Sequence, residues 1–393
     1  MNKDNHLAII DFGSNKLRLC VFDNNSSNLF LGSKNISQND DLEEYSNSIN
    51  FLIRDAESKI SNHLKNIIVL NDSPDIYSID LSIKKIFDQQ INFEDIYSSV
   101  ILEANQLIKN CYATKKIIHF IIKKYVINEK EYLDMPHEIS GITSLILEIK
   151  FICFSYEKYE NILELFKKNS LNVLDFYSTS LVKSFKYMNF FKDNKFVGFL
   201  DIGFERTTII LFINQKLQFL QNIPIGGNHI SKDISNIMKL SLHESEALKK
   251  TFNKSEIDFS YDETNNDENS DLIKKIIKKN ISIDLLKKVV LARIEEIIEL
   301  SFKDISISEY IGSKENLILN LIGSGSKLFN KNTFHLEDKY NFKEINFYEE
   351  SDSEICQAGL EFEKNFKDKF FQKFKKKQKK IGFFQKFFNF FDK

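Results

Sequence analysis

A short polar turn between two apolar strands is the first place in this chain where residue types could do chemistry. The apolar residues 6–10 lead into the segment DFGSNK at residues 11–16, and an alternating strand follows over 17–22. Gly13 permits a tight turn that aims backbone N–H groups at an anion, and the Ser, Asn and Lys side chains add donors and positive charge. Asp11, at the end of a buried strand, could hold a hydrated Mg²⁺. The turn predicts a phosphate site, with a hairpin turn closed by Asp and Asn as the alternative.

Two further glycine turns follow apolar strands. Residues 196–200 lead into Asp201-Ile202-Gly203 and a return strand over 207–213, and residues 317–322 lead into GSGS at 323–326. Asp201 lies 190 residues after Asp11, so a pattern of strand, Asp-x-Gly and strand occurs twice. A nucleotide clamped between two related lobes needs two such hairpins that face each other, and the third turn permits close approach of an adenosine. Three turns of this kind predict nucleotide-binding ancestry.

The elements that must position these turns follow from hydrophobic periodicity. The spacing predicts helices over 47–64, 94–109, 159–169, 272–300 and 355–366, and strands over 67–70, 117–122, 125–127 and 143–154. Residues 24–50 are polar and predicted to be loop, with one strand near 29–31. The order of elements between 81 and 165 predicts a compact α+β subdomain. The acidic residues 255–271 predict a surface insertion.

The C-terminal residues differ from the rest of the chain in charge and in pattern. Residues 364–393 hold eleven Lys and two Asp, a formal charge of +9, which leaves −11 of the total −2 on the other residues. On a helix, one arc of roughly 180° gathers the apolar side chains of Ile381, Phe383, Phe384, Phe387, Phe388, Phe390 and Phe391. This design is typical of a helix that lies in an anionic membrane surface, with a helix docked on a partner chain as the alternative.

Composition excludes several other classes of protein. No run of about eighteen apolar residues exists, so we expect no membrane span. The N-terminus lacks the hydrophobic core of a signal peptide, so we expect a cytosolic protein. The four cysteines form no CxxC pair and are expected to be reduced and buried. The histidines show no metal-ligand spacing, and His229, His243 and His335 receive no role.

With these motifs described, the chain resembles the FtsA family of actin-related bacterial cell-division proteins over nearly its whole length. Residues 11–16 and 201–203 stand at the two phosphate motifs, and 321–325 resemble the adenosine motif. Further similar segments are MPHEISG at 135–141 in the family's 1C subdomain, IPIGG…SKDI at 223–234 at the start of its 2B subdomain, and residues 244–249 and 292–297. The glycine motifs occur in all actin-like ATPases. The 1C segment combined with a terminal amphipathic helix is what indicates FtsA.

The resemblance implies an α/β fold, the two-lobed actin-like (ASKHA) ATPase fold with an inserted α+β 1C subdomain and a C-terminal amphipathic helix. The implied parts are 1A at 1–80, 1C at 81–165, a return to 1A at 166–195, 2A at 196–225, 2B at 226–305, a return to 2A at 306–363, a basic linker at 364–380 and a membrane helix at 381–393. The nucleotide would be ATP with Mg²⁺, which Asp11 and Asp201 would hold through water. The residues implied to face the nucleotide are Asp11, Gly13, Ser14, Asn15, Lys16, Asp201, Gly203, Gly226, Gly227, Glu246, Lys249, Gly323 and Gly325.

The resemblance also implies a function. The protein would be an adaptor that tethers FtsZ filaments to the inner face of the plasma membrane at the division site. It would bind the FtsZ C-terminal tail on 2B, self-associate into filaments, recruit later divisome proteins, and attach peripherally to anionic membrane lipids. Nucleic acid is not an expected partner. We expect no enzyme beyond a weak ATPase, because the adaptor function does not require turnover.

The second phosphate motif departs from the family pattern. The family continues with more glycines and a Thr-rich turn that ends in Asp, whereas this chain continues Phe204-Glu205-Arg206-Thr207-Thr208. Phe204 and Glu205 hinder close approach of backbone N–H groups to a phosphate, and Glu205 repels it, although Arg206 could compensate. Fast hydrolysis is therefore not expected. From its residues alone, the Glu246–Lys249 pair has a plainer interpretation as an ion pair on a helix surface.

Three alternatives remain open at this stage. The spacing Asp-x-Gly-Ser-Asn-x-x-Arg, from Asp11 to Arg18, also resembles the exopolyphosphatase and guanosine pentaphosphatase family. The actin-like adaptor of type IV pilus assembly is related but normally lacks a membrane helix. A nucleic-acid-binding tail on an inactive pair of lobes would predict salt-sensitive binding to DNA.

Overall fold

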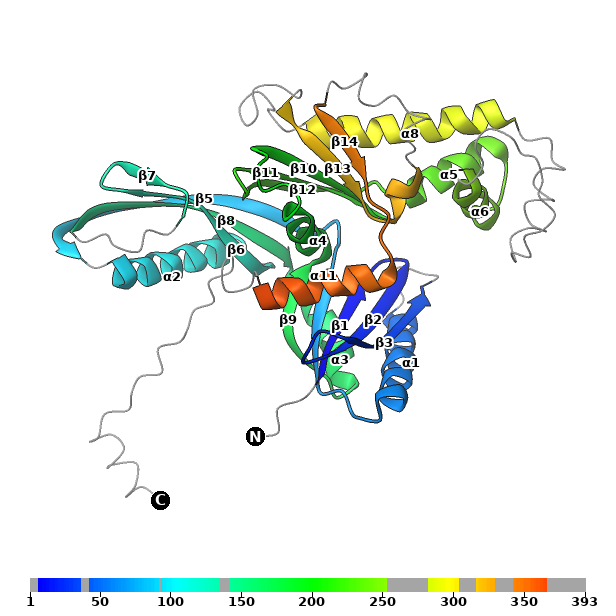
Figure 1. The fold of residues 1–393 in the computed structure, drawn as a ribbon, viewed down its shortest axis with the longest axis horizontal. Coiled ribbons are helices and arrows are strands. Elements are labelled where there is room, and N and C mark those ends of the chain that lie inside the picture. The colour runs from blue at the N-terminus through cyan, green and yellow to red at the C-terminus, as the bar shows by residue number, and fades with distance from the viewer. Residues whose placement is uncertain are drawn as a thin grey trace, which may run out of the picture.

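Two five-stranded sheets of equivalent topology dominate the computed structural model, and a four-stranded sheet extends to one side (Figure 1). The structure describes residues 6–36, 42–91, 93–134, 141–252, 282–303, 316–328 and 342–365. Among the helices of these ranges, none is both long and apolar enough to cross a bilayer. The predicted membrane helix at 381–393, the basic linker from residue 366 onward and residues 135–140 lie outside the described residues.

The first lobe is built on the sheet with the order β3-β2-β1-β4-β9. Its strands are β1 (His6–Phe12), β2 (Lys16–Asp23), β3 (Asn28–Asn35), β4 (Asn66–Asn71) and β9 (Asn172–Ser178), and its helices are α1 (Leu42–Ile60), α3 (Tyr156–Lys168), α4 (Thr179–Met188) and α11 (Asp352–Asn365). The residues 67–70 are fully buried because β4 is a central parallel strand covered on both faces. The carboxyl ends of β1, β4 and β9 therefore meet at one edge of the sheet.

The second lobe repeats this plan with the order β12-β11-β10-β13-β14. Its strands are β10 (Phe196–Ile202), β11 (Thr207–Ile213), β12 (Lys216–Ile223), β13 (Ile318–Ile322) and β14 (Glu344–Phe347), and its helices are α5 (Gly227–Met238), α6 (Leu242–Phe252), α8 (Ile283–Lys303) and the short 3-10 helix η2 (Ser324–Leu328). In the first hairpin Asp11 pairs with Arg18, and in the second Asp201 pairs with Thr208. This matching register confirms the repeat read from the sequence.

The third sheet and one helix form a subdomain over residues 77–155, which we call the side subdomain. It contains β5 (Tyr77–Ile91), α2 (Phe93–Cys111), β6 (Lys115–Ile127), β7 (Lys130–Tyr132) and β8 (Ile142–Ser155), with the strand order β5-β8-β6-β7. Figure 1 shows α2 lying along one face of this sheet. Apolar side chains of α2, among them Val100 and Ala104, share a core with Leu147 and Ile149 of β8. A small α+β unit therefore has its own core, as the order of elements predicted.

Several element boundaries differ from those that periodicity predicted. The first helix begins at Leu42, so part of the predicted loop is helical, and the expected short strand spans Asn28–Asn35. The two strand-like runs between 117 and 127 form the single strand β6. The strand β9 and the helix α4 were not predicted. The buried face of α3, with Leu165 and Phe166, belongs to the core of the first lobe.

The prediction that all four cysteines are buried was wrong at one position. Cys20, Cys153 and Cys356 are buried and Cys111, at the end of α2, is exposed, while all four are free thiols. Burial raises the pKa of the Cys153 thiol to about 12. Only Cys111 therefore presents its sulfur to solvent.

Candidate functional site: the cleft between the lobes

A cavity of about 620 Å³ lies where the strand ends of the two lobes face each other. Twelve of the thirteen nucleotide-site residues implied by the resemblance line it: Asp11, Gly13, Ser14, Asn15, Lys16, Asp201, Gly203, Gly227, Glu246, Lys249, Gly323 and Gly325. Gly226 does not line it. A side chain at Gly226 would meet the backbone of residues 203–206, since a Cβ there would come within 2.6 Å of the Phe204 carbonyl oxygen. The structure thus brings the separate glycine turns together around one cavity.

The polar side chains of the first hairpin are already joined to one another. Arg18 Nη1 donates to Asp11 Oδ2 at 2.6 Å, and its Nε donates to Asp352 Oδ1 at 2.6 Å. Lys16 Nζ also contacts Asp352, at 2.5 Å, and Thr179 Oγ1 donates to Asp11 Oδ1 at 2.9 Å. Asp11 therefore has a partly buried cation and a hydroxyl as partners on the two oxygens of its carboxylate.

Asp201, the equivalent carboxylate of the second hairpin, is also paired. It is 1% exposed, and Lys183 Nζ of α4 lies 2.9 Å from its Oδ2. Arg206 Nη2 lies 3.7 Å from the same oxygen, and Ser180 Oγ lies within 2.6 Å of it. Burial opposes ionisation of this carboxyl, but Lys183 and Arg206 outweigh burial and lower the pKa of Asp201.

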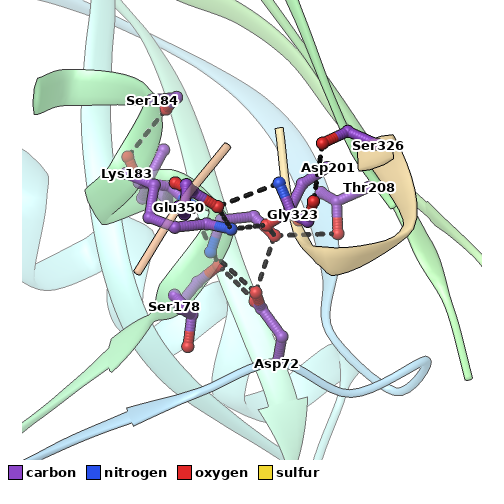
Figure 2. Close-up of polar contacts among 12 residues, drawn as sticks. Asp72, Ser178, Lys183, Ser184, Asp201, Thr208, Gly323, Ser326 and Glu350 are labelled. Carbon is purple, nitrogen blue, oxygen red and sulfur yellow. Dashed lines mark hydrogen bonds and ion pairs between the residues drawn. The ribbon is translucent and has the colours of Figure 1, made fainter. Parts of the chain in front are cut away.

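Asp72 follows β4 and completes the floor of the cleft (Figure 2). Arg206 contacts its Oδ2, the Ser180 backbone N–H donates to that oxygen at 2.7 Å, and Ser178 Oγ donates to Oδ1 at 2.8 Å. Ser180 Oγ lies 2.6 Å from Asp72 and 2.6 Å from Asp201. One hydroxyl proton cannot serve both carboxylates, and burial together with the negative charge of Asp201 raises the pKa of Asp72 against the opposing effect of Arg206.

Lys183 links this floor to the third glycine turn. Its Nζ lies 2.8 Å from Glu350 Oε2, and that oxygen also accepts a hydrogen bond from the Gly323 backbone N–H at 2.9 Å. Figure 2 shows Lys183 between Asp201 and Glu350. Burial disfavours the ammonium form, but the two carboxylates outweigh burial and raise the pKa of Lys183. Lys183 is therefore held as a charged, buried crosslink.

The opposite side of the cavity is formed by helices of the second lobe. Lys249 Nζ lies 2.6 Å from Glu246 Oε2 and donates to the Gly227 carbonyl oxygen at 2.7 Å. Ser231 Oγ donates to the same Glu246 oxygen at 2.5 Å. Lys249 is 6% exposed, so the interpretation of this pair as a surface ion pair was wrong. Burial lowers the pKa of Lys249 against the pull of Glu246, while Lys249 outweighs burial and lowers the pKa of Glu246.

The altered second phosphate turn keeps its hairpin closed. Gly203 N–H donates to the Arg206 carbonyl oxygen at 2.8 Å, and Glu205 Oε1 accepts from Asn228 Nδ2 at 2.7 Å. Arg206 was expected to compensate for Glu205 near a phosphate. Instead its guanidinium points to the floor, where it also donates to Thr208 Oγ1 at 2.7 Å, and the residue is 8% exposed.

Sequence reasoning missed most partners of the motif residues. They are Asp72, Thr179, Ser180, Lys183, Glu350 and Asp352. Asp72 carried a usable signal, because it ends a buried strand at the same sheet edge as Asp11. Lys183 carried none, because its burial within α4, where almost every residue is buried, appears only in the folded chain.

The sequence comparisons point to one family. A family model described as "Cell division protein FtsA" matches residues 199–337. FtsA of Bacillus subtilis (strain 168) is 24% identical over 318 residues, which cover 76% of this chain and 69% of the relative. FtsA of Streptococcus pneumoniae serotype 2 is 20% identical over 317 residues, 76% of this chain and 66% of the relative. The chain is similar to FtsA proteins. The resemblance read from its motifs is confirmed, and the matched part spans about two thirds of these FtsA relatives.

The solved structures agree on the fold. The chain resembles the PilM–PilN type IV pilus biogenesis complex with a TM-score of 0.59 and 14% identity, over 90% of this chain and 94% of that one. It resembles MreB 5 of Spiroplasma citri bound to AMPPNP with a TM-score of 0.53 and 11% identity, over 93% and 98%. The expected actin-like α/β fold of two lobes is confirmed for this FtsA relative. The expected subdomain boundaries and the nucleotide-contacting residues stay predictions.

The predicted Mg²⁺ ligands can be tested against their surroundings. A hydrated Mg²⁺ needs carboxylate oxygens that face the ion and its waters. Asp11 and Asp201 instead direct their oxygens to Arg18, Thr179, Lys183 and Ser180. Within the described ranges, no group of three or more His, Cys, Asp or Glu side chains has the arrangement of a metal site. The residues present do not fit the ion without rearrangement.

Proposed function

We propose that this chain is a cell-division adaptor that tethers FtsZ filaments to the inner face of the plasma membrane and recruits later divisome proteins. The observation that carries the proposal is the match to FtsA sequences over 76% of the chain. The actin-like lobes and the cleft between them support the same conclusion. The FtsZ C-terminal tail would bind the helical part of the second lobe, which contains α5, α6 and α8. The side subdomain would contact later divisome proteins.

ATP is the proposed ligand of the cleft. The glycine turns line a cavity that lies between two lobes of a fold whose MreB 5 relative carries AMPPNP. The expected role of ATP is to promote self-association into filaments. We propose no more than weak ATPase activity, because Phe204 lines the cleft and the Arg206 guanidinium is already bonded to Asp72 and Thr208.

The membrane anchor is proposed from the sequence of residues 381–393. Seven apolar side chains lie on one arc of this segment, and the last thirty residues carry +9. Each nearby Lys adds about 1 kcal/mol on an anionic leaflet, while ordering a short helix offsets part of the apolar gain. A single anchor is therefore weak, and several anchors on one filament bind strongly. Attachment to the membrane would thus follow from self-association.

Co-sedimentation of the full chain with phosphatidylglycerol-containing vesicles and FtsZ tests the proposal. The wild type is expected to bring FtsZ to the vesicles. Phe387→Glu with Phe388→Glu is expected to abolish this, and Gln385→Glu with Asn389→Glu is the matched control, since it adds the same charge on the polar side of the helix. Vesicle binding without FtsZ capture would contradict the tether. Equal loss in both double variants would contradict the apolar anchor.

A phosphate-release assay on purified protein addresses the alternative enzyme of the same fold. The adaptor proposal expects negligible release from polyphosphate. Rapid release would instead support an exopolyphosphatase-like function. The pilus-assembly alternative rests on a likeness of fold alone, at 14% identity, and specific binding of the FtsZ tail would argue against it.

A further inference from the structure

The floor of the cleft is held together by ion pairs that cross from one lobe to the other. Arg206 of the second lobe contacts Asp72 of the first. Lys183 of the first lobe contacts Asp201 and Glu350 of the second, at 2.9 and 2.8 Å. The exposed fraction of every one of these five side chains is below 10%. We call these five residues the ion clamp.

Hydrogen bonds from neighbouring residues hold the side chains of the ion clamp in place. Arg206 Nη1 also donates a hydrogen bond to Thr208 Oγ1. The Thr208 hydroxyl in turn donates to Asn222 Oδ1 at 2.5 Å. Glu350 is fixed by the Gly323 N–H and by the Tyr187 hydroxyl at 3.3 Å. The positions of the charges are therefore set by backbone and core contacts on both sides.

The two cations of the ion clamp together carry the same charge as one bound divalent metal ion. Buried carboxylates require a countercharge, which a metal ion or a cationic side chain can supply. Arg206 and Lys183 together bring two positive charges to Asp72, Asp201 and Glu350. With two cations already in contact distance of Asp201, a third cation at that carboxylate would be repelled.

We propose that Arg206 and Lys183 take the place of a divalent metal in this cleft, so that closure of the lobes and binding of a nucleotide do not require Mg²⁺. The part of this inference that concerns a nucleotide rests on the proposed function. The part that concerns closure rests on the ion clamp alone. A metal-free polyphosphate would contact the backbone N–H groups of the first hairpin, beside Lys16.

The first test measures ATP binding by the full chain by calorimetry, in Mg²⁺ and in EDTA. The wild-type dissociation constants are expected to agree within about threefold. An affinity that falls by about tenfold or more in EDTA would overturn the inference. The variant Arg206→Met leaves Asp72 without a cation and Asp201 with Lys183 alone, so its ATP affinity is expected to become dependent on Mg²⁺.

Two further variants separate charge from structure. Arg206→Lys keeps the cation and is expected to keep binding independent of Mg²⁺. Lys186→Met lies one turn of α4 from Lys183, does not line the cavity, and serves as the control for loss of a lysine from this helix. Circular dichroism establishes that each variant is folded. Metal independence in Arg206→Met equal to that of the wild type would contradict the assigned role of Arg206.

A second readout needs no nucleotide. Spin labels at exposed Lys59 of α1 and Ile237 of α5, in a Cys111→Ser background, report the distance between the lobes by double electron–electron resonance. The wild type is expected to give one distance distribution that Mg²⁺ does not change, and Arg206→Met a broader one. A wild-type distribution that shifts with Mg²⁺, or an unchanged distribution in the variant, would overturn the ion clamp. If ATP does not bind under any condition, the nucleotide part of the proposed function fails while this readout still decides closure.

Discussion

Each carboxylate at the ends of the two hairpins faces a cation that the chain itself supplies. Asp11 pairs with Arg18, and Asp201 pairs with Lys183. The motif residues were predicted from the sequence because a glycine turn after an apolar strand is a local pattern. Their partners were not predicted, because Lys183 and Glu350 come from other segments, and Lys183 joins Asp201 to Glu350 only in the folded chain. Residue types therefore predicted where the site lies but not how its charges are balanced.

The ion pairs of Asp352 can be tested through the pH dependence of the unfolding free energy. Burial opposes its ionisation, but Lys16 and Arg18 outweigh burial and lower the pKa of Asp352 below 3.8. A carboxylate with a lowered pKa in the folded state stabilises the fold above its unfolded pKa and loses that contribution as the pH falls through the folded value. Asp352→Asn is therefore expected to lose about 1 kcal/mol of unfolding free energy at pH 7. The measurement is urea unfolding between pH 7 and pH 2.5.

The difference between the wild type and Asp352→Asn should shrink as the pH falls below about 4, since protonation removes the same ion pairs. A difference that stays constant over this range would contradict the role assigned to the carboxylate.

Gly323 is the glycine of the cleft that has a positive φ, so a side chain at this position would strain the backbone. Its φ is +88°, and a Cβ would come within 2.2 Å of Asp201 Oδ1 and 2.7 Å of the Ile202 carbonyl oxygen. Gly323→Ala is expected to lower the unfolding free energy by about 2–4 kcal/mol, measured by urea denaturation. Gly227→Ala, where the nearest atom lies at 3.5 Å, should change it by less than about 0.5 kcal/mol.

The elements that carry the site were predictable to different degrees. Both hairpins were predicted because their strands are apolar and separated by a short polar turn. The helix α4 was not, although it is buried on almost all sides in the folded chain, where Thr, Ser and Lys side chains share the buried positions with apolar ones. It lies between the two lobes, where both sheets cover it (Figure 1). The element that supplies Lys183 is thus a helix that is buried along almost its whole length.

The helix α11 joins the site to the core of the first lobe. Asp352 at its start contacts Lys16 and Arg18, and Phe362 near its end packs edge-on against Tyr177 at 5.1 Å and near Phe185 at 5.6 Å. Phenylalanine recurs every four residues from 362 to 374, and the first of these side chains packs on the body of the protein. The later members, Phe366, Phe370 and Phe374, lie outside the described residues.

Truncation of this aromatic contact is expected to destabilise the first lobe. Phe362 is 1% exposed, so Phe362→Ala should lower the unfolding free energy by about 3–5 kcal/mol through lost burial and a residual cavity. Gln357→Ala, on the exposed side of the same helix, should have little effect. Chemical denaturation monitored by far-ultraviolet circular dichroism measures both, and equal losses would contradict the packing described for α11.

At the scale of the whole molecule, the side subdomain contacts the second lobe although it is inserted in the first. Ser78 Oγ donates to the Leu220 carbonyl oxygen of β12 at 2.8 Å. Asn222, at the end of β12, donates to the carbonyl oxygens of Ser73 at 3.0 Å and Ile76 at 2.7 Å. Because Asn222 also accepts from Thr208, hydrogen bonds connect the floor of the cleft with the segment that leads into β5.

Removal of the Asn222 side chain should loosen that connection. Asn222→Ala is expected to increase amide hydrogen exchange about tenfold at the start of β5, near residues 76–79, because the carbonyl partners lose two donors. Gln218→Ala on the same strand is the control. Unchanged exchange in Asn222→Ala, measured by mass spectrometry of peptides, would show that the side subdomain is held by other contacts.

The uneven burial of the thiols gives this protein a single chemical handle. Cys111 is exposed at the end of α2, near the junction of the side subdomain with α3, while the other three sulfurs are buried. A maleimide dye added to the native protein should therefore attach once per molecule, on the subdomain proposed to meet later divisome proteins. A fluorophore on Cys111 would report binding of such proteins without any engineered cysteine.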